Sequence, residues 1–552
     1  MGEENWTPYQ QKILPGSPIL PSFGLEQYGL PIPRKNGEAW RQFDVPGLVG
    51  TDYSSDPSEI GRDLVLDKAQ VETYEEILKL KGAWIDDEKC SGRLVYINGR
   101  YTPSLSYSTE IAKNLSEKDF ASGNLSEEII ENMNRLTDGF TDRLAADVPS
   151  GETEFLTSQK TLSGPNHHVG DAASQFSINN QAGTACFVAL NSVKAGAVAL
   201  VSVPSSEEYS GNQPKPVVLV VNAITADGGL QADSKEAGSA SHPRSLVMTE
   251  ENTRLSFVQS FIDLDDANDA GAKPKLVNGC TQIFVGAGSN VTHTYLQETG
   301  GMVTGGVELA EKDVEEGAEI PRDIESKRKS LLDTHFESID VQLIGDDGRY
   351  ECGVMGLGGT GRSRISISTS LLRPRTHAAV NGLMLAGGAQ RTDMRTNIHH
   401  IAQGTTSRQG QKNMIGGRAT GLFKGRIRVE QSAQQTDSEQ LARTVLLSDK
   451  SKAWATPSLE IIADDVMCTH GATVSDLSEE ELFYLRSRGI DRTTARNILM
   501  YAFVDDVASY IEPEMCGDKD DPLSLKNRVI SRLQNLVPQG EKELVGGEFQ
   551  SV

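Results

Sequence analysis

Apolar and polar residues alternate in short runs between about residues 175 and 473 of the chain. In the clearest run, residues 423–429, the odd-numbered positions carry Phe, Gly, Ile and Val and the even-numbered positions carry Lys or Arg. Because successive side chains of a strand point to opposite faces, this pattern predicts a strand with one buried face. Other short runs rich in Val, Ile, Thr and Ser, not all of them alternating, occur at 216–223, 254–262, 281–285, 291–296, 363–369 and 458–462.

This long strand-rich stretch has few helices within it, and from about residue 340 to 473 almost no amphipathic helix pattern appears. A doubly wound α/β sheet needs a helix between successive strands, so that fold class is excluded. A sandwich, a barrel and a β-solenoid remain open, because no clean short repeat distinguishes among them.

Helical periodicity appears at both ends of the chain. Residues 72–82 and 125–137 show apolar side chains at i, i+3 and i+4 spacing. Near the other end, Ser478 and Glu481 predict a capping box, and Gly489 predicts the end of that helix. Two further helices are expected, the first capped by Asp491 with an inner face at 495, 498, 499, 502, 503 and 507, and the second after Asp-Pro at 521–522.

These patterns divide the chain into three predicted parts. Residues 1–150 form an N-terminal helical domain, residues 151–473 form the β core, and residues 474–552 form a C-terminal helical domain. An acidic insert at about 308–329 interrupts the strands, and both a short helix and a disordered loop remain open for it.

Composition narrows the class of partner. The chain of 552 residues has a net charge of −24, which opposes binding to nucleic acid or to anionic membranes. No window approaches the roughly 20 apolar residues of a membrane helix, and the first 20 residues lack the features of a secretory or transit signal. Six scattered cysteines without a C-x-x-C pair predict a soluble protein of a reducing compartment.

Two motifs suggest chemistry at first sight. Residues 356–361 fit G-x-G-x-x-G, but they lead into an alternating strand and not into a helix, so a glycine-rich turn is favoured over a dinucleotide site. Adjacent histidines at 167–168 and 399–400 would point to opposite faces of a strand and are interpreted as hydrogen-bonded or surface residues. The chain also lacks the G-x-x-x-x-G-K-[ST] motif, so we expect no nucleotide hydrolysis by this chain alone.

Cys468 and His470 form the one candidate site. In an extended segment their side chains project on the same face, which would place a soft thiolate beside an imidazole. A buried cysteine beside a hydrogen-bonded histidine is the alternative interpretation.

The C-terminal half resembles the SufD family, with its sister family SufB. The motifs that carry the resemblance are FKGRIRV at 423–429, AQQTD at 433–437, LEIIADDV at 459–466, CTHGAT at 468–473 and LFYLRSRGI at 482–490. A family signature also appears near the start, as GLP at 29–31 and EAWR at 38–41, followed by Asp44. The resemblance is dense over about 390–510.

The resemblance implies a mainly β protein with a right-handed parallel β-helix core, flanked by N-terminal and C-terminal helical domains. It also implies a non-catalytic scaffold subunit that pairs with a SufB-like subunit and docks a SufC-like ABC ATPase. A transient Fe–S cluster would form at the SufB interface, with no cofactor permanently bound to this chain. The compartment would be the plastid stroma in a plant or alga, or the bacterial cytoplasm.

The resemblance also assigns roles to individual residues. His470 matches the SufD histidine at the SufB–SufD interface, as an iron ligand or proton acceptor, and Cys468 lies beside it. The family has a lysine where this chain has Met467. The expected ATPase-docking residues are apolar positions of the C-terminal helices, Leu482, Phe483, Leu485, Ile498 and Phe503.

Two other functions compete with this one. A β-solenoid enzyme acting on polysaccharide is disfavoured, because such enzymes carry a secretory signal and this chain shows none. A SufD-like homodimer with a carrier role is the other alternative.

Overall fold

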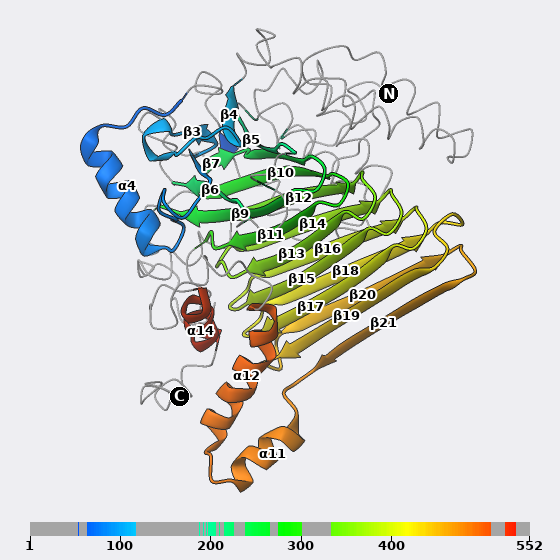
Figure 1. Ribbon diagram of the computed structural model, residues 1–552. Coiled ribbons are helices and arrows are strands. Elements are labelled where there is room, and N and C mark those ends of the chain that lie inside the picture. The colour runs from blue at the N-terminus through cyan, green and yellow to red at the C-terminus, as the bar shows by residue number, and fades with distance from the viewer. Residues whose placement is uncertain are drawn as a thin grey trace, which may run out of the picture.

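The computed structural model describes residues 53–54, 63–116, 187, 191, 195, 197–205, 209, 215–225, 238–264, 274–300, 333–508 and 525–536. Within them, two large sheets of mostly parallel strands lie face to face, and the strands stack like steps along the molecule (Figure 1). Among the described residues, no helix is long and apolar enough to cross a membrane.

The first sheet, called sheet A here, runs from β4 at one end to β20 at the other. Its strands, in sheet order, are β20 (Lys452–Ile461), β18 (Thr420–Val429), β16 (Arg391–His400), β14 (Arg362–Leu371), β12 (Thr334–Leu343), β10 (Lys275–Val285), β8 (Arg244–Thr249), β5 (Ala197–Val203) and β4 (Ala112–Ser116). Off this path, β7 (Gly238–Ser241) pairs with β10, and β1 (Tyr53–Ser54) pairs with β7.

The second sheet, called sheet B here, runs from β3 to β21. Its strands, in sheet order, are β21 (Val466–Ser475), β19 (Thr436–Leu446), β17 (Thr406–Ile415), β15 (His377–Ala386), β13 (Arg349–Gly356), β11 (Asn290–Gln297), β9 (Arg254–Asp263), β6 (Val217–Ile224), β2 (Gly92–Ile97) and β3 (Arg100–Tyr101).

From β8 onward, consecutive long strands alternate between the two sheets, so each coil of the chain contributes one strand to each. His377 of β15 lies beside Thr406 of β17, 29 residues later, and Ser407 lies beside Ser438, 31 residues later. This is the arrangement of a parallel β-helix, so the predicted fold class is confirmed; its handedness stays a prediction. The sequence shows no clear repeat of this coil, because equivalent positions in successive coils are alike in burial and not in residue type.

One coil is longer than the coils on either side of it. His293 of β11 pairs with Cys352 of β13, 59 residues later. The predicted acidic insert at 308–329 falls in this interval and lies outside the described residues, as does the predicted helix at 125–137.

The space between the sheets is filled by the inward faces of the strands. In β18, every second residue is buried, and the buried set includes Phe423, Gly425, Ile427 and Val429, as the alternation predicted. These side chains join a continuous core that reaches back to Leu94 of β2. Period-2 alternation is therefore a direct record of the interior of the β-helix.

Helices from both parts of the chain pack against the outer face of sheet B, and one of them, Glu479–Ser487, lies mostly beyond the last strand (Figure 1). They are α4 (Lys68–Leu80), α11 (Glu479–Ser487), α12 (Arg492–Ala508) and α14 (Leu525–Leu536). Leu78 of α4, Met500 of α12 and Val529 of α14 belong to one buried cluster with Leu383 and Met414 of sheet B. The first and last helices of the described chain thus share a single core.

Local capping chemistry sets several helix ends. Asp67 and Gln70 form a capping box at the start of α4, which confirms the predicted helix in this region. At α11 the amide of Glu481 donates to the Ser478 hydroxyl over 3.3 Å, which is the Ser478 half of the predicted capping box. Gly489 adopts a φ of 89°, which suits glycine at the end of a helix. At α12 the amide of Thr494 donates to Asp491 over 3.1 Å.

Two helical predictions need correction. Strands β2 and β4 lie inside the segment predicted as helical at 1–150, where they pair with β6 and β5 of the sheets. On α12, Met500 and Val504 are buried and Ala502 is exposed, so the inner face is rotated from the predicted one. The domain boundaries themselves stay predictions.

Candidate functional site

The last coil of the β-helix, formed by β20 and β21, has a neighbour on one side only. β20 pairs with β18, and β21 pairs with β19, and each ends its sheet (Figure 1). No position of either strand is buried, whereas all ten positions of β12 are buried. Within the described part of the chain, the β-helix therefore ends in an open coil whose two ten-residue strands each have one unpaired edge.

His470 and Cys468 lie in this open coil, on the inward row of β21. In register, Cys468 lies beside Ser438 and His470 beside Gln440, and both neighbours are buried. The predicted shared face of Cys468 and His470 agrees with this register. Their role in cluster assembly stays a prediction.

The two side chains differ in environment. Cys468 is half-buried against the interior core, and desolvation raises the pKa of its thiol. The thiol is therefore protonated at neutral pH, and a metal would have to displace that proton. His470 is exposed, so its imidazole is open to an incoming ion or partner. Among the described residues, no group of three or more His, Cys, Asp or Glu side chains is arranged to hold a metal ion.

Exposed apolar side chains surround this site, a feature that sequence reasoning missed. Met467, next to Cys468, is 70% exposed on β21. The others on the last coil and the loop after β20 are Trp454, Ile461, Ile462 and Val474. Their exposure depends on whether another coil stacks on this one, and no local sequence pattern reports that.

The five residues predicted to dock an ATPase fall into two groups. Leu482 is buried, Leu485 and Phe503 pack partly buried against the outer core of sheet B, and Ile498 is half-buried. Phe483 of α11, in contrast, is 73% exposed. All five residues are apolar, as the sequence indicated, but most of them pack the helices against the β-helix.

Tyr484 is a further exposed aromatic residue of α11 that sequence reasoning missed. It is 58% exposed, and the Arg488 guanidinium lies over its ring. The sequence could have indicated this exposure, because Tyr484 follows Phe483 and does not lie on the helix face that carries Leu482 and Leu485. Both aromatic rings therefore lie outside the buried core.

The remaining motifs have structural roles. Residues 356–361 end β13 and lead into β14, so the glycine-rich turn is confirmed. His399 contacts Glu430 over 2.7 Å, while buried His400 contacts Thr405 and Ser407, so the two rings do lie on opposite faces. The pair at 167–168 lies outside the described residues.

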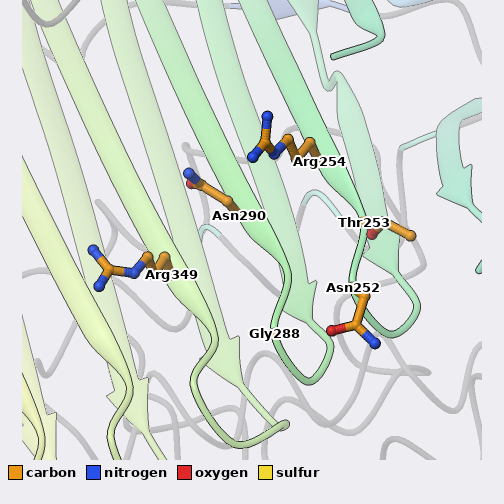
Figure 2. A pocket seen from close by; sticks show the side chains of 6 residues that line it. All are labelled: Asn252, Thr253, Arg254, Gly288, Asn290 and Arg349. Carbon is orange, nitrogen blue, oxygen red and sulfur yellow. The ribbon is translucent and has the colours of Figure 1, made fainter. Parts of the chain in front are cut away.

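A polar pocket of about 440 Å³ lies where β9, β11 and β13 begin (Figure 2). Arg254, Asn290 and Arg349 come from these three adjacent strands, and Asn252, Thr253 and Gly288 belong to the turns before them. The lining presents guanidinium and amide groups, without the thiol or imidazole that would suit iron. In sheet order, β15, β17 and β19 separate it from His470 of β21.

Comparison with known proteins identifies the class. Residues 231–503 match the SufBD core domain of the SUF system for FeS cluster assembly. An iron–sulfur cluster assembly SufBD family protein of Synechocystis is 24% identical over 484 residues, which cover 87% of this chain and 84% of that protein.

Two further relatives match over shorter stretches. The iron–sulfur cluster assembly protein SufD of Escherichia coli is 31% identical over 211 residues, 38% of this chain and 47% of that protein. The chloroplastic protein ABCI7 of Arabidopsis thaliana is 29% identical over 268 residues, 48% of this chain and 49% of that protein. The chain thus spans about half of each of these two relatives.

The parallel β-helix and the matched core domain define an iron–sulfur cluster assembly protein. The chain belongs to the SufBD family, on the SufD-type side of it.

Proposed function

We propose that this chain is the SufD-like, non-catalytic subunit of a SufBCD-type assembly scaffold and pairs with a SufB-like subunit through β20 and β21. The observation that carries the proposal is the open last coil, with its two unpaired strand edges. Exposed strand edges present backbone N–H and C=O groups ready to pair with another chain, and folded proteins usually protect them. Here the edges are long and carry exposed apolar residues, which supports a partner at this end.

His470 is proposed to act at this interface as a ligand of the nascent cluster or as a proton acceptor. Neutral imidazole suits iron, and histidine titrates near physiological pH, so both roles are chemically available. A cluster usually takes four protein ligands, and the last coil offers Cys468 and His470. The proposal therefore assigns the other ligands of this transient cargo to the partner.

The ATPase partner is proposed to bind α11 through Phe483 and Tyr484. Deleting residues 474–552 would be an ambiguous test, because Met500 and Val529 lie in the core shared with α4. Phe483→Ala with Tyr484→Ala leaves that core intact. We expect this double variant to lose capture of a SufC-type ATPase, while Leu80→Ala, an exposed apolar control on α4, keeps it. Unchanged capture by the double variant would reject the docking site.

Pairing is tested by placing charge on the open edges. Ile461→Lys combined with Met467→Lys changes two exposed side chains, so the fold should persist while pairing is lost. Val65→Lys, at an exposed apolar position near α4, is the matched control. Capture of a SufB-type subunit by the double variant at the wild-type level would contradict the proposal. A second copy bound in place of that subunit would favour the homodimeric carrier instead.

The cluster role is tested at His470 with the partner subunits co-produced. His470→Ala should leave the complex intact and lower the iron and acid-labile sulfide it holds, and His470→Cys should partly restore them. Wild-type cluster content in His470→Ala would reject the role.

The chloroplastic and bacterial relatives support a plastid stroma or a bacterial cytoplasm as the compartment.

A further inference from the structure

Behind His470, the interior of the β-helix holds glutamine side chains where apolar ones would be expected. Gln409 of β17, Gln440 of β19 and His470 of β21 occupy one register position in three consecutive strands. Gln440 Nε2 donates to Gln409 Oε1, and Gln409 Nε2 donates to Thr396 Oγ1 of sheet A. The two amides therefore form a buried ladder that ends directly beneath His470.

One atom of this ladder lacks a partner. Gln440 is 1% exposed, and its Oε1 is buried and accepts no hydrogen bond within the described part of the chain. A buried carbonyl oxygen without a donor costs free energy, so a nearby donor should be drawn to it. Because Gln440 Nε2 donates to Gln409 of the preceding coil, we expect the donor to Oε1 to come from the last coil.

His470 is the suitable donor in the last coil. Across the interior, Gly425 leaves room for the Gln440 amide, since a Cβ there would lie 2.2 Å from Nε2. The residue in register with Gly425 is Pro457, which has no N–H. The next inward residue of β21 after His470 is Ala472, whose side chain has no donor. His470, in register with Gln440 itself, carries a ring N–H.

We propose that Gln440 is the positioning residue of His470: its Oε1 accepts the N–H of one ring nitrogen, and the other nitrogen then faces the open end of the β-helix. Hydrogen bonds of this kind fix the tautomer and ring orientation of metal-binding histidines. Gln409 and Thr396 hold the Gln440 amide so that the oxygen, and not the NH₂ group, meets the ring. The inference rests on the proposed role of His470 in cluster assembly.

The tautomer of His470 tests the contact without any cluster. The full chain, labelled with ¹⁵N-histidine, is measured above the usual histidine pKa of about 6.5, and His470→Ala assigns the signals. We expect one dominant tautomer in the wild type and a mixture in both Gln440→Met and the shorter Gln440→Asn. Gln411→Met, which removes another buried amide outside the His470 register, should leave the signals unchanged.

Two results would overturn the positioning role. A wild-type chain that already shows an even mixture of tautomers has no fixed acceptor, whatever the variants do. A folded Gln440 variant that keeps the wild-type tautomer shows that the acceptor lies elsewhere.

Cluster content supplies the second test, with partner subunits co-produced and ferrous iron and sulfide added without oxygen. We expect Gln440→Met to lower cluster content by about 10-fold, and to have no further effect in a His470→Ala background. An equal loss in both backgrounds would mean a merely structural role and would overturn the inference. If His470→Ala alone keeps wild-type content, the proposed role of His470 fails, and the tautomer measurement still decides the contact.

Discussion

The coil formed by β12 and β13 and the coil formed by β20 and β21 have the same architecture but differ in burial. β12 and β20 are both ten-residue parallel strands of sheet A. Every residue of β12 is buried, and no residue of β20 or β21 is. The difference lies in stacking: β12 lies between β10 and β14, and β20 has β18 alone. The strand edges of a coil stay open when no described part of its own chain stacks on it.

The largest expected difference is in the free energy of unfolding lost when each of two residues of the same inward row is truncated. Ile427 of β18 is fully buried, and its register neighbour Leu459 of β20 is half-exposed. Ile427→Ala should lower the free energy of unfolding by about 2–5 kcal/mol, through lost burial and the cavity left behind. Leu459→Ala should cost less than half as much in the isolated chain. Denaturant unfolding of the two variants measures the contrast, and equal losses would mean that the last coil is not open.

Acid–base behaviour sharpens the comparison. Burial raises the pKa of Glu337, on β12, from 4.5 to about 8. The folded chain therefore holds a proton at Glu337 that the unfolded chain releases, so the contribution of Glu337 to stability should fall as pH rises from about 4.5 to about 8, by on the order of 1.4 kcal/mol per unit. Glu337→Gln should flatten the slope by this amount in pH-dependent unfolding measurements, while the buried carboxyl groups of Asp333 and Asp340, whose pKa values are also raised, keep their contributions.

The matched control lies on the open coil. The hydrogen bond from Arg426 lowers the pKa of Glu460, on β20. Its contribution has the opposite sign, since stability is lost as pH falls through the folded pKa, and solvent screening keeps it small. Glu460→Gln should leave the slope between about pH 4.5 and pH 8 unchanged. The same flattening in both variants would contradict the assignment to Glu337.

A smaller effect should appear where α14 joins the β-helix. Arg528 pairs with Glu298 beside β11, and its guanidinium also donates to the Lys81 carbonyl oxygen over 3.0 Å. Arg528→Ala should lower the free energy of unfolding by roughly 1–3 kcal/mol, because Glu298 is left buried without this partner. Thermal unfolding checks the loss, and Arg486→Ala on exposed α11 serves as the control, with a change near zero expected.

The local parts of this picture were predictable from the sequence. Alternation is a property of a single strand, so the buried row of β18 and the shared face of Cys468 and His470 could be read without a structure. Capping is equally local, which is why Ser478 and Asp491 were placed correctly. The SufD-type family was recognised from motifs that the core-domain match at 231–503 confirms in large part.

The other features depend on tertiary packing, which a local sequence pattern does not report. Leu482 and Phe483 are both apolar neighbours on a helix, and only the placement of α11 decides that the first is buried and the second is free. The polar interior was also beyond reach, since hydrophobic patterning assumes apolar inward rows, and here His293, Glu337 and Gln440 are inside. Register between strands some 30 residues apart brings Gln440 beneath His470, and no local pattern reports it.

Hydrogen exchange at the last coil tests the central claim most directly. Backbone amides on unpaired strand edges exchange quickly, and pairing with another strand protects them. Peptides covering 452–475 should therefore exchange quickly in the isolated chain and slowly in complex with a SufB-type subunit, while peptides of β12 and β14 stay protected in both. A complex that forms with protection elsewhere and none at 452–475 would contradict the account.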